Sequence, residues 1–265
     1  MAGVPAVLFI RESITENSSA LRSFLPKHVI LALARRAATA TAAVSTYVAT
    51  LAGGVDVVSW PEVSEDAYLA PASATHTPGR IVMLGSIHPA KGQADAVLAV
   101  ADARRRGLDV TLSIYGGGID EHIARLRTLI DEQRVGDKIV FEGPTSDPLG
   151  ILRGAEASIV CSSSEAYGRV TAESLIVGTP VFGYATGGTA EILDLGGGVS
   201  VAPSVQALSD ALFEHFSDAL RMEQLRRECK ARAARRETFG NATRTIEDVF
   251  MALSGKAVGT RAASD

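Results

Sequence analysis

The stretch ASIVCSSSEAYGRVTAESLIVGTPVFG, residues 157–183, holds one complete strand–helix–strand unit. The runs ASIV (157–160) and PVFG (180–183) are short and apolar, as the buried strands of a parallel sheet are. Between them RVTAESLIVG (169–178) predicts a helix, which the Gly-Thr-Pro sequence at 178–180 ends. Two buried strands joined through a helix predict a right-handed parallel crossover.

The same alternation extends from Ile81 to Val201. It predicts further strands at IVML (81–84), VTLSIY (110–115), KIVF (138–141) and GVSV (198–201), and helices at 94–107, 119–133 and, more briefly, 147–155. Strict alternation of strand and helix predicts an α/β fold with a doubly wound parallel sheet. Six strands match one Rossmann-like domain, for which we expect residues 73–240.

The two ends of the chain have a different pattern. Residues 1–72 contain three strand candidates, VPAVLFIRE, ATAAVS and VDVVSW, and an amphipathic helix at 27–39, which together predict a truncated N-terminal α/β portion. Residues 71–79 are a linker by composition. Beyond Pro203 the pattern is helical; we expect 241–253 to form a helix that packs back toward the N-terminal part, and 254–265 to form a disordered tail.

Composition excludes several classes of function. A net charge of −4 gives no general attraction for nucleic acid, and no apolar run is long enough to span a membrane. Two cysteines make no disulfide framework, and neither they nor the five histidines show metal-ligand spacing. The opening MAGVPAVLFIRES is predicted to be a strand rather than a signal peptide, so we expect a cytoplasmic protein. Residues 26–43 also have a membrane-surface interpretation, although an ordinary packed helix is favoured.

Ligands of open parallel sheets bind beyond the carboxyl ends of the strands, and four loops there contain unusual residues. GSIHPAKG (85–92) places Lys91 at the start of a helix, where an ammonium and free amides attract anions. YGGG (115–118) allows close backbone approach at Gly116, and FEGPTS (141–146) forms a turn at Gly143 and Pro144 that can read a base. A solvated lysine and plain surface turns are the alternatives. YGGG is also half a dinucleotide fingerprint, with Glu121 in place of the third glycine.

The strongest signal is in the fourth loop, within residues 162–180. Glu165 precedes the helix and Glu173 lies in its first turns, with Gly168 at the helix start. The amides from Gly168 to Thr171 offer a helix N-terminus to a diphosphate, while carboxylates can hold the hydroxyls of a ribose or a sugar. Capping and surface glutamates are the alternative, but Glu173 lies in an otherwise apolar helix, where an unpaired charge is costly.

Taken together, these segments resemble the C-terminal domain of glycosyltransferase family 4, the retaining GT-B enzymes. The resemblance covers residues 80–250 and is carried by LGSIHPAKGQ, LSIYGGG, IVFEGPTSD, SSSEAYGRVTAESLIVGTPVFGYATGGTAEIL and ETFGNATRTIEDVF. It includes the family's E-x7-E motif, as Glu165 and Glu173, and a GG-x-x-E run ending at Glu191. A weaker likeness covers residues 1–70. The expected fold is therefore GT-B-like, with one complete Rossmann-like domain.

The resemblance also implies roles for single residues. Lys91 would contact the donor diphosphate, Glu165 the transferred sugar and Glu173 the ribose, and Lys91 and Glu165 are the expected catalytic residues. The full expected donor site is Gly85, Ser86, Lys91, Gly116, Gly143, Pro144, Glu165, Ala166, Tyr167, Gly168, Arg169, Val170, Thr171 and Glu173. The resemblance further implies no cofactor and no metal. Ser86 departs from the family pattern, which often has an arginine there as a second phosphate contact.

The leading hypothesis is a retaining hexosyltransferase-type enzyme that transfers a sugar from a nucleotide-diphosphate sugar to an acceptor hydroxyl. The acceptor is an unidentified glycan, lipid or small molecule. Because the N-terminal portion is short, the alternative is a non-catalytic nucleotide-sugar-binding module or one half of a split glycosyltransferase, completed by a partner chain or by self-association. A dinucleotide-dependent oxidoreductase built on YGGG is a third interpretation, which the incomplete fingerprint disfavours.

Overall fold

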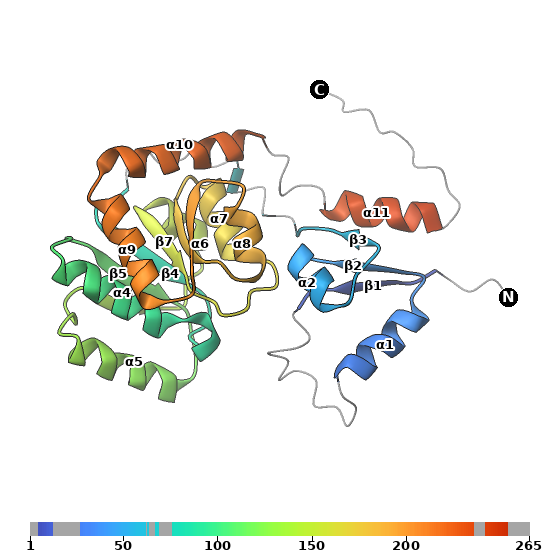
Figure 1. Cartoon of the computed structure of the whole chain (residues 1–265), viewed down its shortest axis with the longest axis horizontal. Coiled ribbons are helices and arrows are strands. Elements are labelled where there is room, and N and C mark those ends of the chain that lie inside the picture. The colour runs from blue at the N-terminus through green and yellow to red at the C-terminus, as the bar shows by residue number, and fades with distance from the viewer. Residues whose placement is uncertain are drawn as a thin grey trace. The chain divides into compact units, whose positions relative to one another are not determined.

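The computed structural model of the chain describes residues 5–12, 27–61, 63, 67–68, 76–235 and 242–253. It divides into two compact units (Figure 1), one comprising residues 1–62 and 237–265 and the other residues 63–236. Residues 71–75 of the expected linker and the tail at 254–265 lie outside the described residues. The domain limits at 72 and 240 stay predictions.

The smaller unit is built on a three-stranded parallel sheet in the order β1–β2–β3. Its strands are β1 (Val7–Ile10), β2 (Ala40–Ala43) and β3 (Val57–Val58), and its helices are α1 (Lys27–Ala37), α2 (Thr46–Leu51) and α11 (Ala242–Leu253). The three strand candidates are confirmed, but α2 was not predicted. Ser45, expected as the end of a strand, instead caps α2, because its hydroxyl accepts a hydrogen bond from the Val48 amide at 3.1 Å.

The larger unit contains a six-stranded, fully parallel sheet. Its strands are β4 (Arg80–Leu84), β5 (Thr111–Tyr115), β6 (Ile139–Gly143), β7 (Ala157–Val160), β8 (Val181–Tyr184) and β9 (Gly198–Val201). Its helices are α4 (Gln93–Arg105), α5 (Asp120–Glu132), α6 (Pro148–Arg153), α7 (Arg169–Ile176), α8 (Gly187–Leu193), α9 (Val205–Phe216) and α10 (Ala219–Arg235). The predicted alternation is confirmed, and only α8 and a short 3-10 turn, η1 (Pro89–Lys91), were not predicted.

The order of the strands, β6–β5–β4–β7–β8–β9, is that of a Rossmann-like sheet. The chain winds outward from β4 to β6 on one side, crosses over, and winds outward again from β7 to β9. The order therefore reverses between β4 and β7, which are neighbours in the sheet. At such a switch point the loops after the two strands diverge, and a crevice opens at their carboxyl ends.

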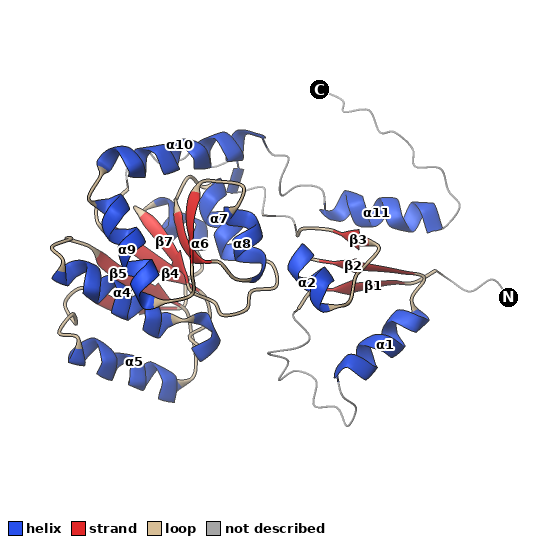
Figure 2. Ribbon diagram, viewed as in Figure 1, coloured by secondary structure: helices blue, strands red, loops and turns tan. Residues whose placement is uncertain are grey.

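Helices cover both faces of this sheet (Figure 2). Contacts place α4, α5 and α9 together on one side and α6, α7 and α8 together on the other. The central strands β7 and β8 are buried at every residue, which explains why their sequences are continuously apolar instead of alternating. Among the largest fully buried side chains are Ile81, Leu112, Ile159 and Phe182, one from each of four strands. The packed core therefore fixes the positions of the strand ends that border the crevice.

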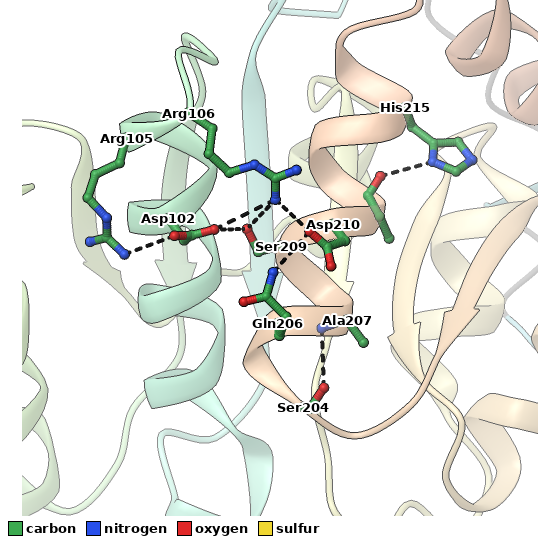
Figure 3. Close-up of polar contacts among 10 residues, drawn as sticks. Asp102, Arg105, Arg106, Ser204, Gln206, Ala207, Ser209, Asp210 and His215 are labelled. Atoms are coloured by element: carbon green, nitrogen blue, oxygen red, sulfur yellow. Dashed lines mark hydrogen bonds and ion pairs between the residues drawn. The ribbon is translucent and has the colours of Figure 1, made fainter.

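A polar network joins α4 to α9 at the surface of this unit (Figure 3). The Ser209 hydroxyl donates to the Asp102 carboxylate at 2.6 Å, and this bond holds the pKa of Asp102 below its usual range. Arg106 contacts the Asp210 carboxylate at 2.7 Å, and its guanidinium lies 4.1 Å from the centroid of the Phe213 ring. Arg106 therefore combines an ion pair with a cation–π contact across the two helices.

Replacing Arg106 with alanine is expected to lower the free energy of unfolding by about 1 kcal/mol, because both contacts are lost together. Urea denaturation followed by circular dichroism measures this change. The matched control is Arg105→Ala. Arg105 is 58% exposed, pairs with Asp102 on its own helix and hydrogen-bonds to the half-buried Gln133, so the expected loss is below about 0.5 kcal/mol. Equal losses for the two variants would contradict the assignment.

Among the described residues, no helix has both the length and the apolar character that crossing a membrane requires. In the same part of the chain, no three histidine, cysteine, aspartate or glutamate side chains gather as metal ligands would.

Candidate functional site

A pocket lies at the switch point of the six-stranded sheet, beyond the ends of β4 and β7 and at the start of α7. Its lining residues are Met83, Leu84, Gly85, Ser86, Lys91, Ile159, Val160, Ser162, Glu165, Gly168, Arg169, Val170 and Thr171. The strand ends make an apolar floor, while the loops and the helix provide polar groups above it. This is the place where an open parallel α/β sheet binds its ligand.

The loops after β4, β5 and β6 are tied to one another by their backbones. The Gly85 amide donates to the Tyr115 carbonyl at 3.0 Å, and the Gly116 amide donates to the Gly143 carbonyl at 2.9 Å. A Cβ atom at Gly116 would lie 1.8 Å from the Gly85 carbonyl oxygen, and Gly116 has a φ of +148°. Only glycine fits at position 116. It allows the loops after β4 and β5 to meet, and it does not itself line the pocket.

Lys91 is held at the pocket by a close approach of two loops. It ends η1, whose N-cap is His88, and Gly92 follows in the left-handed region with a φ of +72°. A Cβ atom at Gly92 would lie 2.3 Å from the Cys161 carbonyl oxygen, so the turn is pressed onto the end of β7. The Ser163 amide donates to the Ala90 carbonyl at 2.9 Å and fixes the two loops together.

Lys91 and Glu165 form an ion pair in the pocket. The Lys91 Nζ atom lies 2.6 Å from Glu165 Oε2, and the two side chains are 33% and 22% exposed. They are 74 residues apart in sequence and come from loops on opposite sides of the switch point. The sequence predicted both residues for one site but not their direct contact, which depends on the folded positions of two separate loops.

The loop that carries Glu165 is supported from behind by α8. The Gly188 amide donates to the Glu165 carbonyl at 2.7 Å, and the Thr186 hydroxyl donates to the Ser162 carbonyl at 2.6 Å. A Cβ atom would lie 2.3 Å from the Glu165 carbonyl oxygen at Gly187 and 2.2 Å from the Tyr167 carbonyl oxygen at Gly188. These contacts explain why residues 187 and 188 are both glycine: the loop that carries Glu165 packs directly on the backbone of α8.

The N-terminus of α7 opens onto the same pocket. Gly168 precedes the helix with a φ of 92° and a ψ of 50°, and as a glycine it has no side chain to cap the first turn. Arg169, Val170 and Thr171, the first three residues of the helix, line the pocket. Backbone amides at this position have no partner within the helix, and together with the helix dipole they attract an anion.

Glu173 lies on the second turn of α7 and is only 15% exposed. Burial raises the pKa of this carboxyl, and the nearby Arg169 acts in the opposite direction. The Arg169 Nε atom lies 3.6 Å from Glu173 Oε1. Glu173 is therefore a largely buried carboxylate beside the pocket, not a surface glutamate.

The structure brings eight of the fourteen expected site residues together as pocket lining: Gly85, Ser86, Lys91, Glu165, Gly168, Arg169, Val170 and Thr171. The other six do not line this pocket: Gly116, Gly143, Pro144, Ala166, Tyr167 and Glu173. The Tyr167 side chain is buried, which raises the pKa of its phenol. Sequence reasoning missed the floor residues Met83, Leu84, Ile159 and Val160, although their place at strand ends was a usable signal.

Comparison with known proteins agrees with this geometry. The model of the family "Glycosyl transferases group 1" matches residues 67–236, which include all six strands of the larger sheet and the whole pocket. The chain belongs to the group 1 glycosyl transferases. The GT-B-like fold expected from the sequence is confirmed.

Curated relatives match at moderate identity. A glycogen synthase of Mycobacterium tuberculosis is 28% identical over 195 residues, which are 71% of this chain and 43% of that protein. A D-inositol 3-phosphate glycosyltransferase of Thermomonospora curvata is 33% identical over 118 residues, which are 41% of this chain and 27% of that protein. The chain thus spans less than half the length of these relatives.

Solved structures show the same fold. The Anabaena protein Alr3699/HepE in complex with UDP and glucose superposes with a TM-score of 0.77 at 18% identity, covering 94% of this chain and 71% of that one. A mutant of S. aureus TarM in complex with Fondaparinux, alpha-GlcNAc-glycerol and UDP superposes with a TM-score of 0.76 at 15% identity, covering 94% and 50%. At such identities the likeness concerns the fold alone.

Proposed function

We propose that this chain binds a nucleoside-diphosphate sugar in the switch-point pocket and transfers the sugar to an acceptor hydroxyl with retention of configuration, as a member of glycosyltransferase family 4 would. The observation that carries the proposal is the Lys91–Glu165 pair beside the open N-terminus of α7. An ammonium and free amides suit a diphosphate, while a carboxylate next to them suits sugar hydroxyls. Membership of group 1 supports the reaction class.

Each group has a proposed part in the reaction. Lys91 and the first amides of α7 stabilise the charge that develops on the leaving diphosphate, which is the main electrostatic demand of the reaction. Glu165 orients the sugar, and Glu173 holds the ribose hydroxyls just beyond the pocket. The leaving phosphate assists deprotonation of the acceptor, so the protein contributes mainly positioning and charge stabilisation. Lys91 and the backbone amides can contact the phosphates directly, so the proposed reaction needs no metal ion.

UDP is the first nucleotide to test, because several structures with the same fold were solved in complex with it. The acceptor is left as a hydroxyl of unspecified class.

A donor screen tests the proposed activity. UDP-, GDP- and ADP-sugars are incubated with the chain, with and without EDTA, and release of nucleoside diphosphate is measured alone and with a panel of sugar, inositol and lipid acceptors. We expect release from one donor class, insensitive to EDTA. Donor binding without turnover would favour the non-catalytic or split-enzyme alternative. Binding of NAD but of no nucleoside diphosphate would contradict the proposal.

Replacing Glu165 with alanine should separate the sugar from the nucleotide. Because Lys91 loses its carboxylate partner, UDP binding is expected to stay the same or to tighten by up to about tenfold. The additional affinity for the UDP-sugar over UDP is expected to disappear. Isothermal titration with both ligands measures the two effects, with Glu132→Ala, an exposed change on α5, as control. Equal weakening of both ligands would show that Glu165 does not face the sugar.

A further inference from the structure

Among the described residues that line the switch-point pocket, Arg169 is the one cation that does not pair with Glu165. Of the described residues, two cationic side chains line the pocket, Lys91 and Arg169. The Lys91 ammonium already lies 2.6 Å from the Glu165 carboxylate, so much of its charge is compensated. A diphosphate carries more than one negative charge, so compensating it fully requires a second positive group.

The position and exposure of Arg169 suit a second positive group for the diphosphate. It is the first residue of α7, its side chain is 76% exposed, and its one ion pair within the described part of the chain is with Glu173. The 3.6 Å separation between Arg169 Nε and Glu173 Oε1 is longer than a hydrogen bond, which makes this an easily broken contact. The planar guanidinium has five N–H donors, enough to contact a carboxylate and a phosphate together.

Fold stability alone does not explain an arginine at this position. A cation in the first turn of a helix opposes the helix dipole, which favours negative charge there. A cation can occupy this position where a bound ligand supplies the negative charge, because residues that contradict local structural preferences occur mainly at functional sites. The arginine therefore fits the ligand-bound state better than the free helix.

The neighbouring groups offer no equal alternative. The loop after β4 presents Ser86, a neutral side chain, to the pocket. His88 does not line the pocket, and its Nδ1 atom accepts a hydrogen bond from the Ala90 amide at 3.2 Å as the cap of η1. His88 therefore caps the turn, which leaves Arg169 of α7 as the remaining cationic side chain among the described pocket-lining residues.

We propose that Arg169 is the second phosphate-binding cation of the pocket, and that its guanidinium turns from Glu173 toward the diphosphate when the ligand binds. This inference rests on the proposed function, because it takes the ligand to be a nucleoside diphosphate. It assigns the diphosphate to two cations from opposite sides of the switch point, Lys91 after β4 and Arg169 on α7.

The test compares Arg169→Ala with the wild-type chain for three ligands: UDP, inorganic pyrophosphate and uridine, the last two as competitors of UDP. We expect affinity for UDP and pyrophosphate to fall about tenfold, the salt dependence of UDP binding to weaken, and uridine binding to stay unchanged. Arg169→Lys, which keeps the charge, should recover part of the loss. Thermal melting should show Arg169→Ala to be as stable as the wild type.

Arg125→Ala is the matched control, since Arg125 is 67% exposed, forms a similar i,i+4 pair with Glu121 on α5, and does not line the pocket. Unchanged pyrophosphate affinity in Arg169→Ala would overturn the inference. Equal loss for UDP and uridine would overturn it as well, because Arg169 would then act only through the ribose side of the site. A wild-type chain that bound none of the three ligands would contradict the proposed function itself.

Discussion

Lys91→Ala is expected to weaken UDP binding by about 10- to 100-fold, measured by isothermal titration. Hydrogen bonds to charged groups contribute about 1.5–3 kcal/mol, and each 1.4 kcal/mol is a tenfold change in affinity. The variant loses the ammonium and also leaves the Glu165 carboxylate facing the diphosphate without its partner at 2.6 Å. Both effects act in the same direction, which is why this change is expected to be large.

The control for Lys91→Ala is Lys138→Ala. The Lys138 side chain has the same 33% exposure and is also paired with a carboxylate, with Nζ 3.6 Å from Asp137 Oδ2, but it does not line the pocket. UDP affinity is expected to be unchanged in this variant. A double variant, Lys91→Ala with Glu165→Ala, should recover part of the lost affinity because the repulsive carboxylate is removed. No difference between Lys91→Ala and the control would contradict a role for Lys91 in phosphate binding.

Gly188→Ala is expected to lower the free energy of unfolding by about 1–3 kcal/mol, as overpacking of a dense interior does. The new Cβ atom would lie 2.2 Å from the Tyr167 carbonyl oxygen, so the loop or α8 must move. The sign is informative, because alanine is favoured over glycine in a helix by about 1 kcal/mol when nothing blocks it. Because the Gly188 amide also holds the Glu165 carbonyl, affinity for a UDP-sugar should fall as well.

Gly136→Ala is the control for this change. A Cβ atom there would meet its nearest neighbour, Asp131 Oδ1, at 3.8 Å, which is ordinary contact, and Gly136 does not have a positive φ. We expect a change in unfolding free energy below about 0.5 kcal/mol. If Gly188→Ala were as stable as the wild type and bound the UDP-sugar equally well, the packing of the Glu165 loop on α8 would be wrong.

Much of the fold follows from local sequence patterns. The six strands of the larger unit were predicted because short apolar runs alternate with amphipathic stretches, and the Gly-Thr-Pro stop after α7 fixed one boundary. α8 was missed because it begins with two glycines, which local propensity assigns to a turn. Those glycines are required by the loop packed against them, and this tertiary cause is invisible in a local pattern.

The candidate site was predicted in part for the same reason. Carboxyl ends of parallel strands meet at one edge, so residues after β4 and β7 could be assigned to one place before the structure was known. The contact between Lys91 and Glu165 could not be predicted, because it depends on the close packing of the loop at Gly92 against the end of β7. The assignment of Gly116 to ligand binding stays a prediction, and the structure adds that its backbone lies against the Gly85 carbonyl.

The most direct measurement is a crystal structure of the chain grown with UDP. We expect diphosphate density at the N-terminus of α7, within hydrogen-bond distance of the Arg169–Thr171 amides and of Lys91 Nζ. The nucleoside is predicted to extend toward Glu173. Diphosphate density outside the switch-point pocket, or an unoccupied pocket in crystals saturated with UDP, would contradict the claim that this pocket is the donor site.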